Sequence, residues 1–483
     1  MRTRVHRPRA IPLFLVAAVA LSLSIGAIPC TVSAQGDPLP GYSLFEINGA
    51  KVYFRKPSSA EEAPLAQIGA IMMAGIGNQT ADEAHCAHMA EHMVCMYPGP
   101  SGESVWSISG KDYRLGNPLP LNGYTSLDTT TWVISAAHSD TFRVLTAFLG
   151  SMFRSTLQSD EAFKTEIKRA RREIDVMTGR DISALMNKVK VAVFEGTRYY
   201  ETLFETPLTE VTAEKIRGFI EREYTPSRLT LIIQADVDEK ELVEHIARCL
   251  EGIDPGRGPD DHSDVHLDPP SQATIVVGAN RQYAGLAVGI SGVVPEDRPV
   301  VLALMNIVTR RLYRVPQTGR VRFLRTLHDT FIAQSTVVTT YGYIDSRGAD
   351  MSPDVERHVE ALSSILESLA SKGPDVEELS YFVIPGTPGI SIDMSRIPYA
   401  GANEAVNALL YGDLASIWDR AEAYPEDTLE VLKAAAAKYL PNAKITVVYQ
   451  KQPSNSGAAL VLTIGAVAAC IAAGVFFWRR TTG

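Results

Sequence analysis

Three residues within one short segment have the types and spacing needed to bind a metal ion and activate water. The segment His88-Met89-Ala90-Glu91-His92 places two histidines four positions apart, with a glutamate beside the second. On a helix, positions i, i+3 and i+4 share one face, so both imidazoles can reach one ion while the Glu91 carboxylate lies next to it. Zinc takes histidine and carboxylate ligands in a tetrahedron, and a catalytic site leaves one position for water. The pattern therefore predicts one zinc ion per chain, with Glu91 as the general base.

A catalytic zinc needs a third protein ligand, and the sequence offers a helix that could supply it. Residues 161–177 include Glu166 and Glu173, which are seven positions apart and so lie on one face. Glu173 is the candidate third ligand. Glu166, two turns away, could orient one of the ligand histidines from behind. This segment also contains Lys168, Arg169, Arg171 and Arg172, so a charged surface helix without any metal role is the alternative.

These residues belong to a chain whose pattern mixes strands and helices, which predicts an α+β fold. Alternation around Asn48-Gly49 predicts a hairpin at residues 42–55. Apolar runs predict strands at 66–74, 129–137 and 229–234, and helical spacing predicts helices at 81–96, 139–153, 160–178 and 239–250. A polar loop rich in glycine and proline is expected at 98–120.

A segment rich in glycine, proline and aspartate divides the body into two halves. We predict a linker at residues 251–272, a catalytic domain at 35–250 and a second domain at 273–453. The second half has strand patterns near 273–277, 284–290 and 444–450, and helical patterns near 300–313 and 354–371. Both halves begin with strands and close with a helix and a strand, which predicts two related mixed α/β domains of about 200 residues each.

Both ends of the chain are apolar. Four arginines and an apolar run precede Val32-Ser33-Ala34, which predicts a secretory signal at residues 1–34, with a mitochondrial transit peptide as the alternative. Residues 458–478 carry no charge and precede Arg479 and Arg480, which predicts a transmembrane helix with the body outside the cytoplasm. A buried core helix and a processed sorting tail are the alternatives. We expect a membrane-anchored, extracytoplasmic protein, on a periplasmic or outer face or in a secretory lumen.

Charge and cysteine content exclude two classes of protein. The net charge is −9, and removal of residues 1–34, with four arginines and no acid, takes it to −13. An acidic body without long basic runs disfavours nucleic-acid binding. Only Cys86, Cys95 and Cys249 lie outside the apolar ends, which is no disulfide framework, and the spacing of Cys86 and Cys95 disfavours a bridge between them.

The order and spacing of these motifs resemble the pitrilysin family of zinc peptidases, which includes insulin-degrading enzyme and mitochondrial processing peptidase. In that family an inverted zinc motif is followed, after a similar interval, by a helix with two glutamates seven apart, and here Glu173 follows His92 by 81 residues. The segment 122–129, Asn-Gly-Tyr-Thr-Ser-Leu-Asp-Thr, is similar to the family's edge strand beside the substrate. The segment 224–230, Tyr-Thr-Pro-Ser-Arg-Leu-Thr, is similar to its tyrosine-proline step into a strand.

The resemblance implies an endopeptidase that acts on peptides or unfolded segments. It implies zinc held by His88, His92 and Glu173, and a substrate strand aligned by Asn122 and Thr125. In the second half, the stretch from Arg311 to Arg325 resembles the family segment whose arginine holds the substrate backbone, which makes Arg325 a candidate. Family members enclose substrate with four domains, so a chain with two is expected to pair with itself or with a related chain.

The sequence departs from the family pattern at several points. Glu83-Ala84 replaces the glycine before the motif, Phe331-Ile332 stands where the second-half tyrosine is expected, and a glycine-rich run before Arg311 is missing. These departures favour an alternative function: a family member with weak or lost activity that serves as the binding or assembly partner of another peptidase chain.

Overall fold

The computed structural model describes residues 39–449 apart from stretches at 40, 60–62, 110–120, 156, 179–180, 198, 203–210, 261–264, 268–273, 277–282, 316–321, 328–336, 346–351, 384–400 and 412–423. The predicted signal at 1–34 and the predicted apolar span at 458–478 lie outside these residues. Among the described helices, none is both long and apolar enough to cross a bilayer.

The first half is built on a six-stranded sheet with the order β1-β2-β6-β3-β5-β4. The predicted hairpin is confirmed: Asn48 and Gly49 have φ of +51° and +85°, and the two-residue turn with positive φ joins antiparallel strands. β2 and β6 are parallel and the other neighbours are antiparallel. The strands are β1 (Ser43–Ile47), β2 (Ala50–Arg55), β3 (Ala66–Met72), β4 (Leu121–Thr125), β5 (Thr130–Ala136) and β6 (Leu229–Gln234).

The second half contains a five-stranded sheet with the order β7-β11-β8-β10-β9. Its first pair is parallel and the rest are antiparallel, which repeats the β2-β6-β3-β5-β4 part of the first sheet. The expected mixed fold with two similar halves is therefore present in the strand order, while the domain boundaries stay a prediction. The strands are β7 (Thr274–Val276), β8 (Tyr283–Ile290), β9 (Arg322–Leu327), β10 (Val338–Asp345) and β11 (Lys444–Val448).

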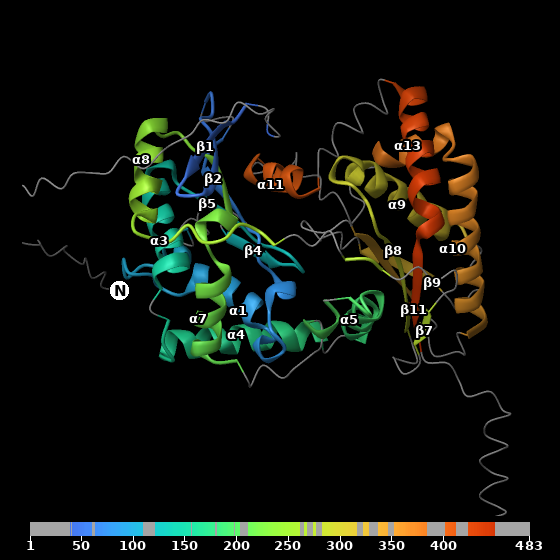
Figure 1. Cartoon of the computed structure of the whole chain (residues 1–483), viewed down its shortest axis with the longest axis horizontal. Helices are drawn as coiled ribbons and strands as arrows, with labels where there is room; N and C mark the ends of the chain where they lie inside the picture. Colours follow the sequence, from blue (N-terminus) through green and yellow to red (C-terminus); the bar gives the residue numbers. More distant parts are fainter. Residues whose placement is uncertain are drawn as a thin grey trace, which may run out of the picture.

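Each sheet buries one face under helices of its own half, and these helices form the outer layers in Figure 1. The apolar residues between sheet and helices form one core in each half. The helices of the first half are α1 (Cys86–Met96), α2 (Val105–Ser109), α3 (Thr141–Arg154), α4 (Glu161–Thr178), α7 (Ala213–Glu223) and α8 (Glu239–Leu250), with a short α6 (Tyr199–Thr202). Those of the second half are α9 (Arg298–Tyr313), α10 (Ser352–Lys372) and α13 (Pro425–Tyr439).

The other face of each sheet receives a helix from the opposite half. α5 (Asp181–Val193) packs against β8 and β11, and α11 (Gly401–Tyr411) packs against β3 and β6. Both helices lie between the two sheets (Figure 1). The backbone N–H of Ala402 donates to Gln67 Oε1 at 2.9 Å, which anchors the start of α11 on the first sheet. The two halves are therefore joined by an exchange of helices as well as by the chain between them.

The structure corrects two sequence predictions near the motif. The helix predicted at 81–96 begins only at Cys86, because His85 has a φ of +68° and Ala81–Glu83 form a separate 3-10 turn. A residue in the left-handed region cannot continue a right-handed helix. The predicted loop at 98–120 contains α2, whose Val105 and Ile108 are buried in the first core.

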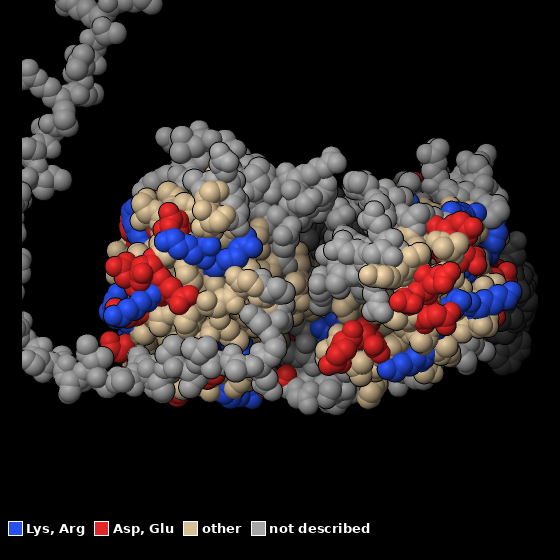
Figure 2. Space-filling model, turned by 90° about the horizontal axis from the view of Figure 1, so that it is seen from above, with Lys and Arg blue, Asp and Glu red and all other residues tan. Residues whose placement is uncertain are grey.

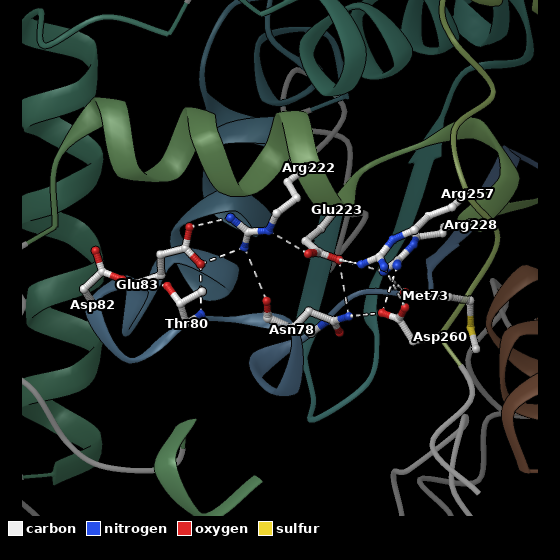
Figure 3. Close-up of polar contacts among 11 residues, drawn as sticks. Met73, Asn78, Thr80, Asp82, Glu83, Arg222, Glu223, Arg228, Arg257 and Asp260 are labelled. Atoms are coloured by element: carbon white, nitrogen blue, oxygen red, sulfur yellow. Dashed lines mark hydrogen bonds and ion pairs between the residues drawn. The ribbon is translucent and has the colours of Figure 1, made fainter. Parts of the chain in front are cut away.

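A network of charged residues holds the chain that leads into α1 (Figure 3). Arg222 of α7 donates to both carboxylate oxygens of Glu83, each at 2.7 Å, and to Glu223 at 2.8 Å. The fully buried Arg228 donates to Glu223 and to Asp260, both at 2.8 Å. Buried charges are tolerated when they are paired in this way, and removal of one partner is strongly destabilising. The network fixes a segment that has no sheet or long helix to support it.

Asn78 joins this network to the backbone before the motif. Its amide donates to Asp260 Oδ2 at 3.1 Å and to Glu223 Oε2 at 3.3 Å, while its carbonyl oxygen accepts from the N–H of Gly75. The side chain of the next residue, Gln79, accepts the N–H of Ala87 at 2.8 Å. This bond satisfies one of the donors that the first turn of a helix leaves unpaired, and so it fixes the start of α1.

The ion pair of Glu83 predicts a pH-dependent contribution to stability. Burial opposes ionisation of Glu83, but Arg222 and the N–H of Thr80 outweigh burial, so the pKa of Glu83 lies below its usual 4.5. A carboxyl with a lowered pKa in the folded state stabilises above its unfolded pKa and loses that contribution as the pH falls through the folded value. Glu83→Gln should therefore lower the free energy of unfolding at pH 7, and the deficit relative to the parent should shrink below about pH 4.5.

Urea unfolding from pH 7 downward measures this deficit. Glu161→Gln is the matched control, because Glu161 also pairs with a cation, Lys164, but its side chain is fully at the surface, where ion pairs contribute little. A deficit for Glu83→Gln that stays constant into acid, or one that Glu161→Gln reproduces, would contradict the role given to the network.

Candidate functional site

The structure brings the three predicted ligands together. His88 and His92 project from α1 and Glu173 from α4, and the ligand atoms of the three residues all lie within 4.8 Å of one another. The two Nε2 atoms are 3.3 Å apart, and His92 Nε2 lies 3.4 Å from Glu173 Oε2. The helix with the two glutamates therefore faces the motif helix, and its Glu173 lies beside both histidines.

The distances in this group fit a tetrahedral zinc ion. Zinc–nitrogen bonds of about 2.0–2.1 Å at tetrahedral angles place two ligand nitrogens about 3.3 Å apart, which is the separation of the two imidazole nitrogens here. The donor set of two imidazoles and one carboxylate is also that of a catalytic rather than a structural zinc. The residues present thus fit the metal that the motif predicts.

Glu166, the candidate for orienting a ligand histidine, lies near His92. Its Oε2 is 3.9 Å from His92 Nδ1, while its Oε1 accepts from Arg169 at 2.6 Å. Both the Nδ1 and the Oε2 atom are buried without a hydrogen-bond partner among the described residues. A distance of 3.9 Å is too long for a hydrogen bond, but the two atoms face each other. A histidine that gives Nε2 to a metal carries its proton on Nδ1, and Glu166 is the acceptor nearest to that proton.

The electrostatics of the imidazoles follow from the carboxylates around them. Burial alone would lower the pKa of His92, but Glu166, Glu173 and Glu91 outweigh burial and raise it to about 9. Burial and the neighbouring His92 lower the pKa of His88 to about 4, so His88 is neutral at pH 7 and its ring can act as a ligand. Three carboxylates gather around two imidazoles, an excess of negative charge that suits a divalent cation.

The side chain of Glu91 extends from α1 toward the edge strand β4. Burial raises the pKa of its carboxyl to about 7, although the hydroxyl of Thr125 donates to Oε2 at 2.6 Å and opposes the shift. The backbone of Gly123 passes so close that a Cβ on it would lie 2.4 Å from Glu91 Oε1. The indole N–H of Trp132 donates to the Glu91 carbonyl at 3.2 Å. These contacts hold Glu91 beside the ligand group, with a pKa suited to proton transfer near neutral pH.

The predicted substrate residues fall in different places. Thr125 and Gly123 lie on the side of β4 that faces Glu91, whereas Asn122 and the 46% exposed Tyr124 alternate to the other side. Thr125 is thus part of the site and Asn122 is not in contact with Glu91. The sequence analysis missed that Gly123 makes room for the Glu91 carboxylate by having no side chain. A glycine inside a strand pattern could have indicated this close approach.

Of the two second-half arginines singled out in the sequence, Arg311 has a described side chain and Arg325 does not. Arg325 lies in β9, paired with Tyr343 of β10, and its side chain is outside the description, as are Phe331 and Ile332. Arg311 donates to both carboxylate oxygens of Glu378, at 2.8 and 2.7 Å. A bidentate ion pair of this kind fixes the orientation of the Arg311 guanidinium within the second half. Cys86, Cys95 and Cys249 are free thiols, as predicted.

Comparisons with known proteins agree with this architecture. Residues 210–382 match the family model of the Peptidase M16 inactive domain. A probable mitochondrial-processing peptidase subunit beta from Arabidopsis thaliana is 23% identical over 259 residues, which is 52% of this chain and 44% of that protein. The chain thus matches less than half the length of this curated relative. The segment matched by the family model contains none of the residues His88, Glu91, His92 and Glu173.

Solved structures extend the likeness to most of the chain. A protease from Helicobacter pylori superimposes with a TM-score of 0.61 at 14% identity, covering 85% of this chain and all of that one. Pitrilysin superimposes with a TM-score of 0.56 at 16% identity, covering 85% of this chain and 45% of that one. At these identities the likeness concerns the fold. The chain is thus similar to M16 peptidases in sequence over residues 210–382 and in fold over most of its length.

Proposed function

We propose that this chain is a zinc-dependent endopeptidase that hydrolyses peptides or unfolded protein segments. The observation that carries the proposal is the cluster of His88, His92 and Glu173. Glu91 is buried next to this cluster and is not one of its three ligand residues. A buried carboxylate adjacent to a zinc-ligand set has the place and the pKa of a general base.

The residues divide the chemistry between them. His88, His92 and Glu173 would hold the metal, and Glu166, whose Oε2 lies 3.9 Å from His92 Nδ1, would orient that ring. Zinc, when bound there, makes a water molecule more acidic and polarises the substrate carbonyl. Glu91 takes the proton from the attacking water on its carboxylate and passes it to the leaving nitrogen. Thr125 holds Oε2 of Glu91 by its hydroxyl, which leaves Oε1 for the proton.

The edge strand β4 provides a place for an extended substrate. It ends the order of described strands in the first sheet and carries Thr125 against Glu91. An added strand along such an edge gains main-chain hydrogen bonds that do not depend on its sequence, which suits peptides of varied composition. The exposed Tyr124 would contact the side chains of the added strand.

A second function is favoured by two observations. The matched family model is that of an inactive domain, and Arg311 in the second half is held by Glu378. A chain with weak or lost activity could act as the binding or assembly partner of a related peptidase chain. Either function is compatible with a homo- or heterodimer, and with an anchored body outside the cytoplasm, as the segments at 1–34 and 458–478 predict.

Glu91→Gln should abolish peptide cleavage while zinc binding persists. The substitution keeps the shape of the side chain and all three ligands but removes the proton acceptor, so the rate should fall by about 10²–10⁴-fold. Zinc content of the purified chain and cleavage of a mixed peptide library are measured on the parent and the variant together. Zinc in the parent without cleavage would favour the partner function, and a parent without zinc would overturn both the metal site and the peptidase.

Thr125→Val should slow cleavage without loss of zinc. The hydroxyl orients the Glu91 carboxylate, and loss of a hydrogen bond to a charged group of this kind corresponds to about a tenfold decrease in rate. Thr125→Ser, which keeps a hydroxyl at the same position, is the control and should retain most of the activity. Equal rates for parent, valine and serine variants would show that β4 does not position the base.

A further inference from the structure

The third ligand stands where α4 leaves the first half of the molecule. Four residues of α4 pack against the first core at helical spacing, and Ile174 is the last of its described side chains to do so: Phe163, Ile167, Ala170 and Ile174. Glu173 itself has a side chain that is 49% exposed, compared with 13% for His92. The side chain of Glu173 is therefore not enclosed by neighbouring side chains, and its position depends on the backbone of α4.

The course of α4 is continued by α5, which belongs to the second half by its contacts. Two residues separate the end of α4 at Thr178 from the start of α5 at Asp181, and α5 packs against the second sheet. Its buried residues share a core with residues of β8, β10 and β11, namely Leu185, Met186, Val189 and Val193 with Ala287, Tyr341 and Val448. Lys444, a buried residue at the start of β11, donates to the carbonyl of Val193 at 3.1 Å. A cation bonded to the last carbonyls of a helix also stabilises its dipole.

The surface under α5 is shaped to admit it closely. Gly285 of β8 faces α5, and a Cβ on it would lie 2.2 Å from Val189 Cγ2 and 3.2 Å from Met186 Cε. Neighbouring positions of β8 alternate: Leu286 and Val288 face the core under α9, α10 and α13. The absence of a side chain at Gly285 is therefore what lets α5 lie against this sheet.

We infer that the second half positions Glu173 by clamping α5 against β8 and β11, so that zinc affinity depends on this contact between the halves. The inference rests on the proposed zinc site. His88 and His92 lie on α1, which packs in the first core. Glu173 lies on α4, which packs against the first core, and the next helix, α5, packs against the second sheet. A shift of α5 on the second sheet would move Glu173 relative to the two histidines and leave a two-histidine site. Glu173 is thus placed by residues that never touch the metal.

The test is a pair of substitutions that remove and restore the fit beneath α5. Gly285→Ala puts a methyl group against Val189 Cγ2, and Val189→Ala in the same chain removes the atom that it meets. The zinc dissociation constant of the full chain is measured by competition with a chelator, and the visible absorption of the cobalt-substituted chain reports the number of ligands. Gly285→Ala should weaken zinc binding about tenfold, as loss of ligand positioning does, and change the cobalt spectrum, while the double variant should recover most of both.

Two further variants separate a clamp from a general loss of stability. Val288→Ala lies on the same strand but faces the other core, so it should destabilise the second half and leave zinc affinity unchanged. Lys444→Met removes the bond to Val193 and should weaken zinc binding in the same direction as Gly285→Ala. If the parent binds zinc and Gly285→Ala and Lys444→Met bind it with unchanged affinity, the clamp is overturned and the proposed function stands. A parent that binds no zinc overturns the proposed function, and the clamp with it.

Discussion

Compensation of buried charge at the junction of α1, α4 and β4 is the constraint on which the rest of the structure depends. The buried carboxylates of Glu91 and Glu166 and the half-exposed carboxylate of Glu173 gather around two imidazoles. Uncompensated charge in such a place is costly, and each group is stable there only with a partner at a set distance. Thr125 donates a hydrogen bond to Glu91, Arg169 donates one to Glu166, and His92 lies beside Glu173. The surrounding elements must hold these partners in register.

The first half meets that requirement with a rigid approach to α1. The opposite face of α1 is buried in the first core through Met89, Met93 and Val94, which turns the histidines toward α4. Before α1, the left-handed His85 stands between the preceding 3-10 turn and the helix. Asn78 and Glu83 are connected to α7 by the charged network (Figure 3). Polar interactions thus fix a loop that no sheet supports.

The second half repeats the strand order of the first, and the two halves exchange helices. Each sheet leaves one face for a helix from the other half, so the cores that hold α5 and α11 contain residues from both. These shared cores join the two halves by apolar packing as well as by the connecting chain. Figure 2 shows charged side chains of both signs scattered over one face of both halves, without a large basic field, in line with the acidic balance of the sequence. The only ligand group outlined by the described residues lies in the first half, beside the helices that connect it to the second.

The sequence by itself determined the local geometry of the site. The spacing of His88, Glu91 and His92 and that of Glu166 and Glu173 are helix periodicities, and helix periodicity depends on neighbouring residues alone. The hairpin at Asn48-Gly49 and most strands could be predicted for the same reason. Only the tertiary structure decided the contacts between residues far apart in the chain. These are the side of β4 that meets Glu91, the pairing of Arg311 with Glu378, and the docking of α5 and α11 on the opposite sheets. The start of the motif helix after His85 was also visible only in the structure. No periodicity records such contacts, because they depend on how separate elements pack once each has formed.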